Sequence, residues 1–156
     1  LGHGRSIGVG MAIAAKIKKK IYRVVVVVGD GEINEGSIWE AAMSATKHGL
    51  SHLSVFVDYN KSQGDGNLDE TLSLHPLPDK FKAFHWDVQE ADGHSHKSIQ
   101  QAIVNAKANK NQASVIIAHT QKGYLNAKHN LLNGAHSGNL SSEEFQEAIT
   151  VLKEEI

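Results

Sequence analysis

The sequence has 156 residues, of which 40% are hydrophobic, and this length predicts one domain with a buried core. Its 16 Lys and Arg side chains nearly cancel 17 Asp and Glu, which argues against nucleic acid or an anionic membrane as a partner of the whole domain. The absence of cysteine excludes a disulfide scaffold, a thiolate zinc site and cysteine catalysis, and the lack of a signal peptide or a membrane-length apolar run favours a soluble, cytoplasmic protein.

Helical and strand patterns alternate along the chain. The expected elements are helices over 7–20, 37–48, 79–84, 99–106 and 145–152, and strands over 24–28, 53–57, 87–91 and 115–118. The first strand, Val24–Val28, is an unbroken β-branched run, which is typical of a parallel strand buried on both faces. We therefore predict an α/β fold: a three-layer, doubly wound, mainly parallel sheet that forms a single domain over residues 1–156.

Two of these helices are preceded by a Ser-x-x-Glu pattern. Ser37 with Glu40, and Ser141 with Glu144, each match a capping box. Residues 120–140 show no periodicity and are rich in Asn, Gly and His, so we expect a functional loop there. The chain opens on Leu1 rather than methionine, and we expect that polypeptide upstream of it is absent.

Residues that could bind a metal follow the first two strands. Asp30, between Gly29 and Gly31, follows the first strand, and Asn60 follows the second. If these strands are adjacent and parallel, Asp30 and Asn60 lie together at one sheet edge, where carboxylate and amide oxygens suit Mg²⁺ or Ca²⁺. The glycines let an anion approach the backbone closely, and the helix that opens near Ser37 favours the same anion. A diphosphate bridged by Mg²⁺ fits these features.

Motifs along nearly the whole chain carry a family resemblance. They are Leu1–Gly4 with Ser6–Ala12, Gly29–Gly31, Glu35–Gly36, Ile38–Met43, Val57–Asn60, Gln63–Gly66, Pro76–Phe84, Asp92–His94 and Ala118–Gly123. These segments resemble the thiamine diphosphate-binding domain of the transketolase family, and most closely the short N-terminal subunit of two-chain transketolases. Glu35 favours transketolases over other families that use thiamine diphosphate.

The resemblance implies a set of roles for individual residues. It implies Mg²⁺ ligation by the side chains of Asp30 and Asn60 and by the carbonyl of Ser62. The contacts to thiamine diphosphate that it implies are Leu1, Gly29, Gly31, Asn60 and His136, with the Gly31 amide on the diphosphate. Glu35 would join a carboxylate relay toward the partner subunit, and His136 would lie near the diphosphate; these two are the implied catalytic residues.

The resemblance also implies an activity and partners. Transketolases move a two-carbon ketol unit from a ketose phosphate to an aldose phosphate. A second subunit or domain would bind the pyrimidine end of the cofactor, so we expect an oligomer and sugar phosphate substrates. About the first hundred residues of the family's domain have no counterpart here, so the fold is expected to lack N-terminal elements.

Two alternatives remain open. The segment from Tyr124 to Ala135 departs from the family pattern, which motivates a non-catalytic binding or assembly remnant. A related enzyme that uses thiamine diphosphate on another α-keto compound is the other, although Glu35 and the segment Asp92–His94 argue against it. A zinc site at His94 and His96 matches no standard spacing, and a loop-orienting role for His94 is favoured.

Overall fold

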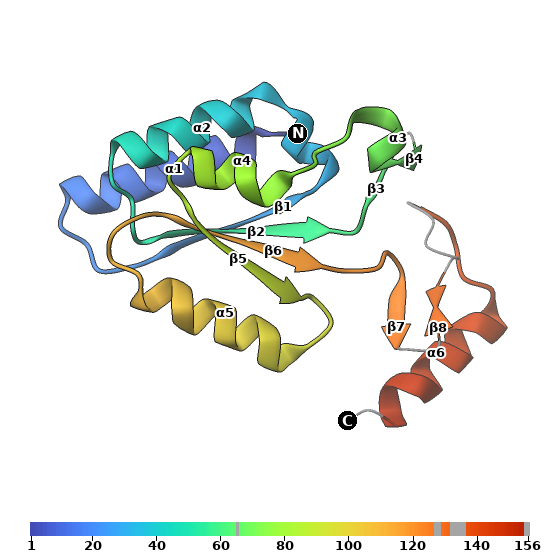
Figure 1. Ribbon diagram of the computed structural model, residues 1–156. Helices are drawn as coiled ribbons and strands as arrows, with labels where there is room; N and C mark the ends of the chain where they lie inside the picture. Colours follow the sequence, from blue (N-terminus) through green and yellow to red (C-terminus); the bar gives the residue numbers. More distant parts are fainter. Residues whose placement is uncertain (65, 127–128, 132–136, 155–156) are drawn as a thin grey trace.

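A four-stranded parallel sheet in the order β1-β2-β6-β5 forms the middle layer of the fold (Figure 1). The computed structural model describes residues 1–64, 66–126, 129–131 and 137–154. The elements are α1 (His3–Ile17), β1 (Val24–Gly29), η1 (Gly31–Asn34), α2 (Gly36–Lys47), β2 (Leu53–Tyr59), β3 (Ser62–Gln63), β4 (Gly66–Asn67), α3 (Leu68–Leu72), α4 (Leu77–Ala83), β5 (Asp87–Asp92), α5 (His96–Ala108), β6 (Ser114–His119), β7 (Tyr124–Asn126), β8 (His129–Asn130) and α6 (Ser142–Glu154).

Helices cover both faces of this sheet. Helices α1, α2 and α4 lie on one face, and α5 lies on the other against β5 and β6 (Figure 1). The predicted three-layer α/β fold with a parallel sheet is thereby confirmed. Strands β1 and β2 are adjacent, with Gly29 opposite Asp58, so the two strand ends that carry the predicted ligands meet at one edge.

The apolar core lies mainly between the sheet and the three-helix layer. Val28, Val55 and Val57 are buried there, together with Ile38 of α2. A smaller cluster lies beneath α5. The two central strands β2 and β6 are buried on both faces along most of their length, which is why their sequences are largely apolar, whereas the edge strand β5 is largely polar.

Two predicted helix boundaries are wrong. The first helix was predicted to run to residue 20, but α1 ends at Ile17, so Lys16 lies in its last turn and residues 18–20 lie beyond the helix. Helix α2 begins at Gly36 with Glu35 as its N-cap residue, and the Ser37 hydroxyl donates to the Gly2 carbonyl at 3.2 Å instead of capping. The 3-10 turn η1 leads directly into α2, which starts the helix before Ser37 could cap it.

The second capping box is confirmed. The Glu144 amide donates to Ser141 Oγ at 3.2 Å, and the Ser141 amide donates to Glu144 Oε2 at 2.8 Å. Part of the predicted loop over 120–140 forms the short antiparallel pair β7–β8.

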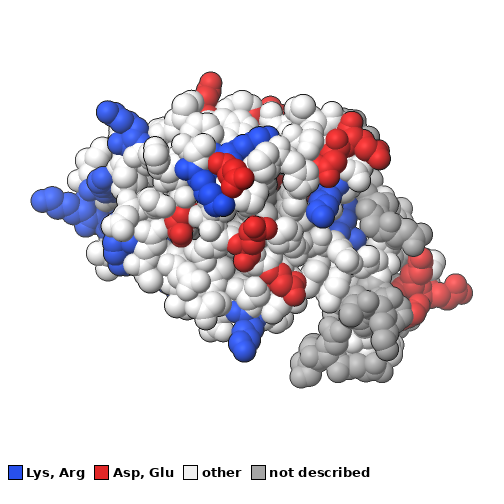
Figure 2. All heavy atoms as spheres, in the orientation of Figure 1, with Lys and Arg blue, Asp and Glu red and all other residues white. Residues whose placement is uncertain are grey.

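No helix within the described ranges is long and apolar enough to cross a membrane. Figure 2 shows acidic and basic side chains interspersed over one face, with a basic group where α1 ends.

Candidate functional site

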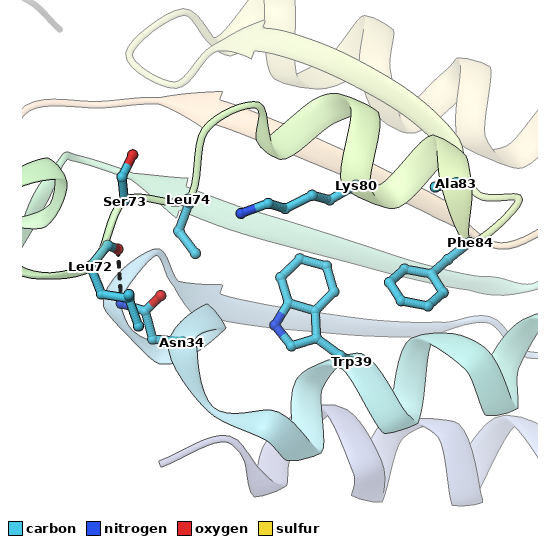
Figure 3. Close-up of a pocket in the computed structure, with 8 residues that line it drawn as sticks. All are labelled: Asn34, Trp39, Leu72, Ser73, Leu74, Lys80, Ala83 and Phe84. Carbon is cyan, nitrogen blue, oxygen red and sulfur yellow. Dashed lines mark hydrogen bonds between the residues drawn. The ribbon is translucent and has the colours of Figure 1, made fainter.

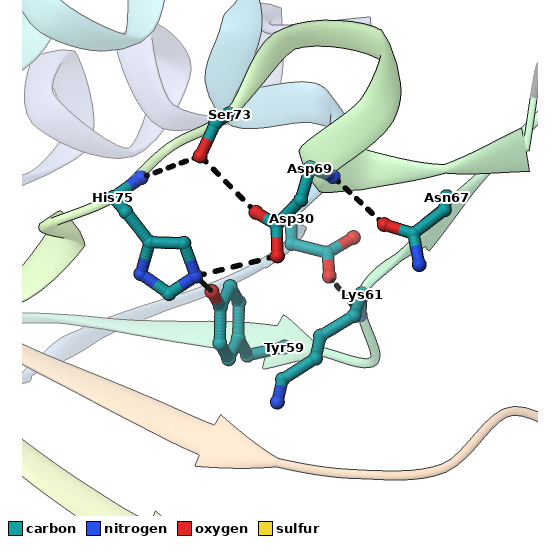
Figure 4. A network of polar contacts seen from close by, with 7 residues as sticks. All are labelled: Asp30, Tyr59, Lys61, Asn67, Asp69, Ser73 and His75. Atoms are coloured by element: carbon teal, nitrogen blue, oxygen red, sulfur yellow. Dashed lines mark hydrogen bonds and ion pairs between the residues drawn. The ribbon is translucent and has the colours of Figure 1, made fainter.

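Asp30 is buried where β1 ends, and backbone groups from two loops hold its carboxylate. Its Oδ1 accepts the Gly31 N–H at 2.8 Å, and its Oδ2 accepts the Lys61 N–H at 2.5 Å. Figure 4 shows the carboxylate turned toward the Lys61 backbone. The residue after Asn60 therefore contacts Asp30 directly, which brings the two predicted metal-binding strand ends together.

Burial raises the pKa of Asp30 above its ordinary value, because desolvation disfavours the charged carboxylate. The N–H bonds from Lys61 and Gly31 and the charge of Lys122 oppose this effect, while the nearby Asp58 carboxylate adds to it. A cation bound beside this desolvated carboxylate would stabilise its charged form.

Asn60 directly follows β2, and Ser62 begins the short strand β3. Asn60 Oδ1 accepts the Ser62 N–H at 3.0 Å, and its amide nitrogen donates to Asp58 Oδ2 at 3.2 Å. Lys122 Nζ donates to both the carbonyl and the hydroxyl of Ser62, at 3.3 Å each. Lys122 follows β6, so three strand ends contribute to this turn.

Gly29 and Gly31, on either side of Asp30, differ in the space available for a side chain. A Cβ added to Gly31 would lie 2.8 Å from Gln63 Cβ, whereas one on Gly29 would meet no described atom within 4 Å. Gly31 is therefore required for the close packing of η1 against β3. Its amide, predicted to face a diphosphate, donates to Asp30 in this conformation.

An open groove of about 450 Å³ lies beside the Asn60 turn. Asp58, Asn60, His94, Lys122 and Tyr124 are among the residues that line it. His94 Nε2 accepts the Gln121 N–H at 2.8 Å, and its ring stacks on Tyr124 with centroids 3.5 Å apart, so His94 orients this loop as predicted. The groove opens beyond the carboxyl ends of the strands, which is where parallel α/β sheets bind ligands.

The oxygen donors fit a hard cation such as Mg²⁺. An ionised carboxylate offers about four lone-pair sites, so Asp30 keeps acceptor capacity after its two N–H bonds. The described residues contain no group of three or more His, Cys, Asp or Glu side chains that could hold a metal by themselves. Mg²⁺ commonly takes one or two protein ligands and completes its shell with phosphate and water, which suits this donor set.

Glu32 is a structural member of the site that the sequence analysis did not single out. Its carboxylate accepts the Gly2 N–H at 2.8 Å and the Gly29 N–H at 3.4 Å, and so joins the start of the chain to the end of β1. Lys122 is the second such residue. Glu32 is a charged residue near the glycines that follow a strand, and Lys122 lies within the motif Ala118–Gly123, but neither was given a role from the sequence.

The remaining predicted site residues are Leu1, Glu35 and His136. Leu1 is exposed next to the Gly2 turn, and Glu35 is exposed at the start of α2. His136 lies outside the described residues. The structure therefore places the Asp30 carboxylate against the segment from Asn60 to Ser62, through its contact with the Lys61 amide, with the exposed Glu35 on the adjoining η1–α2 connection.

A polar network adjoins Asp30 on the side of α3 (Figure 4). The Tyr59 hydroxyl lies 3.4 Å from His75 Nε2, which lies 3.4 Å from Asp69 Oδ2. Ser73 Oγ donates to the other Asp69 oxygen at 3.1 Å. These contacts tie α3 and the segment that follows it to the end of β2.

A separate pocket of about 440 Å³ lies between α2 and α4 (Figure 3). Trp39, Leu74 and Phe84 form much of its wall, and Lys80 and Asn34 lie at its rim. None of the described residues that line it is acidic, so it is not the metal site predicted from the strand ends.

Known proteins that resemble this chain share one family. The family described as transketolase, thiamine diphosphate binding domain, matches residues 1–153. The 6-deoxy-6-sulfo-D-fructose transketolase subunit SqwG of Clostridium sp. is 40% identical over 155 residues, covering 99% of this chain and 56% of that protein. One of the subunits of the apulose-4-phosphate transketolase of Phocaeicola vulgatus is 37% identical over 156 residues, covering 100% of this chain and 56% of that protein. The chain thus spans little more than half the length of these relatives.

Solved structures show the same similarity. A mutant transketolase of Pichia stipitis in complex with fructose-6-phosphate superposes with a TM-score of 0.84 and 25% identity, over 96% of this chain and 24% of that chain. A complex of transketolase from the same organism with sedoheptulose-7-phosphate gives a TM-score of 0.83 and 26% identity, over 94% of this chain and 24% of that chain.

Proposed function

Because the chain belongs to the transketolase family, we propose that it is the diphosphate-binding part of a cytoplasmic transferase that uses thiamine diphosphate and Mg²⁺. The enzyme would move a two-carbon ketol unit between sugar phosphates. The family match to a thiamine diphosphate-binding domain supports the cofactor. One relative is named for a sugar phosphate, apulose-4-phosphate, which supports that substrate class. Another is named for a sulfonated sugar, 6-deoxy-6-sulfo-D-fructose, which supports a sugar with an anionic group more generally.

The observation that carries this proposal is the contact between the two strand ends. The Asp30 carboxylate accepts the amide that directly follows Asn60, so a cation bound by Asp30 would lie beside the Asn60 turn. We assign Mg²⁺ to the side chains of Asp30 and Asn60 and to the Ser62 carbonyl. The Lys122 ammonium, held on Ser62, adds positive charge that favours an anionic diphosphate.

The remaining residues position the cofactor and connect it to a partner. Leu1, Gly29 and Gly31 would contact the cofactor, and the lack of side chains at the two glycines permits close approach. Thiamine diphosphate, when bound, supplies the electron sink for cleaving and forming the carbon–carbon bond. Glu35 would join a carboxylate relay toward the partner subunit, and His136 would lie near the diphosphate.

A second subunit or domain is required in this proposal, because the cofactor's pyrimidine end has no assigned site on this chain. Relatives named as subunits of transketolases support a two-chain enzyme. The exposed Glu35 at the start of α2 is accessible to such a partner.

Calorimetry with thiamine diphosphate and Mg²⁺ tests the half-site in the complete enzyme. We expect Asp30→Ala to abolish binding and Asn60→Ala to weaken it, because each removes an oxygen ligand. Asp79→Ala is the matched control, since Asp79 is an exposed acid that pairs with Lys82 across one helical turn. Binding by Asp30→Ala at the strength of the unaltered enzyme would contradict the assignment. Cofactor binding without ketol transfer to any aldose phosphate would favour a non-catalytic remnant instead.

A further inference from the structure

The pocket between α2 and α4 has a fixed aromatic wall and no part in the proposed cofactor site. Trp39 of α2 packs against Phe81 and Phe84, with ring centroids 5.2 and 5.7 Å apart. Phe81 is fully buried, and Thr46 Oγ1 donates to the Phe84 carbonyl at 2.6 Å, so both phenyl rings are held in place. The volume of about 440 Å³ lies in the range of small-molecule sites, which are mostly preformed and lined by apolar and aromatic side chains.

Two hydrogen-bond donors that line this pocket have no partner in the described part of the chain. They are the Lys80 ammonium and the Trp39 indole N–H. The Trp86 indole N–H, in contrast, donates to a carbonyl of α2 at 3.1 Å, and Lys82 pairs with Asp79 at 3.0 Å. Figure 3 shows the Lys80 side chain extended along the pocket toward Leu74, with the Trp39 nitrogen at the same end.

These donors select an anionic ligand. None of the described lining residues is acidic, so Lys80 gives the pocket a positive charge. Two donors match the two oxygens of one carboxylate, and the half-buried ammonium would form a charge-assisted hydrogen bond with it. The aromatic wall favours a flat apolar ring on the same ligand, because the ring can pack on Trp39 and Phe84 and leave water.

We propose that this pocket binds a small aromatic carboxylate, with its ring against Trp39 and Phe84 and its carboxylate on Lys80 and the Trp39 N–H. The pocket has no described residue in common with the groove beside Asn60, so this is a second site. A sugar phosphate fits it poorly, because sugar hydroxyls would lose water against apolar rings without gaining hydrogen bonds. The proposal does not depend on the assignment of thiamine diphosphate.

Calorimetry on the complete enzyme with three related compounds tests the ligand chemistry. Naphthylacetate has both the ring and the charge, naphthylacetamide keeps the ring without the charge, and acetate keeps the charge without the ring. We expect naphthylacetate to bind about tenfold more tightly than the amide, because only the acid gains the charge-assisted bond, and acetate to give no heat at the same concentrations. Equal affinities for the acid and the amide, or no heat with either, would overturn the proposal.

A matched pair of lysine substitutions on α4 tests the position of the carboxylate. Lys80→Met removes the charge that lines the pocket, whereas Lys82→Met removes a lysine that is 60% exposed and paired with Asp79. We expect Lys80→Met to reduce the affinity for naphthylacetate to that of the amide and Lys82→Met to leave it unchanged. Unchanged binding by Lys80→Met, or equal losses in the two variants, would refute the assigned site.

Fluorine NMR of the enzyme labelled with fluorinated tryptophan locates the ring of the ligand. The Trp39 signal is identified by its absence from the Trp39→Phe variant, and we expect it to shift in step with saturation by naphthylacetate. A Trp39 signal that does not respond would overturn the proposal. A Trp39 signal already shielded from solvent before any ligand is added would assign the pocket to a protein segment, and would overturn it as well.

Discussion

Arg5 provides the sharpest stability prediction, because its guanidinium is fully buried without a hydrogen-bond partner in the described part of the chain. It projects from α1 between two aromatic rings, 4.7 Å from the Phe81 centroid and 4.4 Å from that of Trp86. None of its three nitrogens meets an acceptor among the residues that the structure describes. Desolvation lowers the pKa of Arg5 from its ordinary value to about 9.

The cost of this burial follows from the change in pKa. Each pKa unit corresponds to about 1.36 kcal/mol, so keeping the side chain charged at neutral pH costs about 5 kcal/mol. Two desolvated cation–π contacts return about 2 kcal/mol, which leaves a net cost of about 3 kcal/mol. Methionine has a similar length and no charge, so Arg5→Met is expected to raise the free energy of unfolding by about 3 kcal/mol.

Urea unfolding at pH 7 measures this difference, and its pH dependence supplies a second check. Below pH 9 both folded and unfolded states hold the Arg5 proton, so the penalty is complete. From pH 9 toward 12.5 the folded state releases the proton first, so the unaltered protein regains stability and the advantage of Arg5→Met shrinks.

Arg23→Met is the matched control with the opposite sign. The Arg23 guanidinium donates to the Ser51 and Ala106 carbonyls and to the Ser54 hydroxyl, at 3.0–3.3 Å. Its loss is expected to destabilise the protein by about 1–2 kcal/mol. If Arg5→Met were destabilising as well, Arg5 would have an acceptor, and the reasoning from an unpaired buried charge would be refuted.

Three further predictions concern α1, α6 and the metal site. Gly8→Ala is expected to destabilise the protein by about 1–3 kcal/mol, because the new methyl group would collide with a valine of β1. Gly10→Ala should instead stabilise it by up to about 1 kcal/mol, because alanine favours the helix and nothing lies near the added methyl group. Thermal melts measure both variants, and melting temperatures that change in the same direction would contradict this prediction. Ser141→Ala is expected to cost about 1 kcal/mol by removing the acceptor of the Glu144 amide, with faster hydrogen exchange in the first turn of α6 as the readout. The raised pKa of Asp30 means that its proton competes with Mg²⁺ at higher pH than for an ordinary aspartate, so metal affinity measured by titration should weaken as pH falls from 7 toward 5, and a pH-independent affinity would contradict this.

Much of the fold was predictable because its signals are local. The run Val24–Val28 predicts a parallel strand, and a second strand after one helix predicts its neighbour. The predicted burial of both faces of the first strand is wrong for the residues that the structure describes, because Val25 and Val27 are exposed. The position of Asp30 beside the Asn60 turn follows from these two features, since adjacent parallel strands end at the same edge. Ser141 and Glu144 form their predicted cap because all its atoms lie within one helical turn.

The features that were missed depend on residues distant in the sequence. Ser37 fits a capping pattern but donates to Gly2, which lies 35 positions away. Lys122 reaches the site across 60 positions to Ser62. Sequence periodicity contains no information about such pairs, because they form only after the sheet has brought its strands together.

Local patterning was sufficient to specify the layers, the neighbouring strands and the edge at which Asp30 and Asn60 meet. Packing in three dimensions determined that Arg5 is enclosed by aromatic rings, that Glu32 joins two glycine amides, and that the outer edge of β1 is open in the described part of the chain. The reason is physical: spacing along the chain sets which face a residue occupies, whereas its burial and partners depend on what the other elements place against that face.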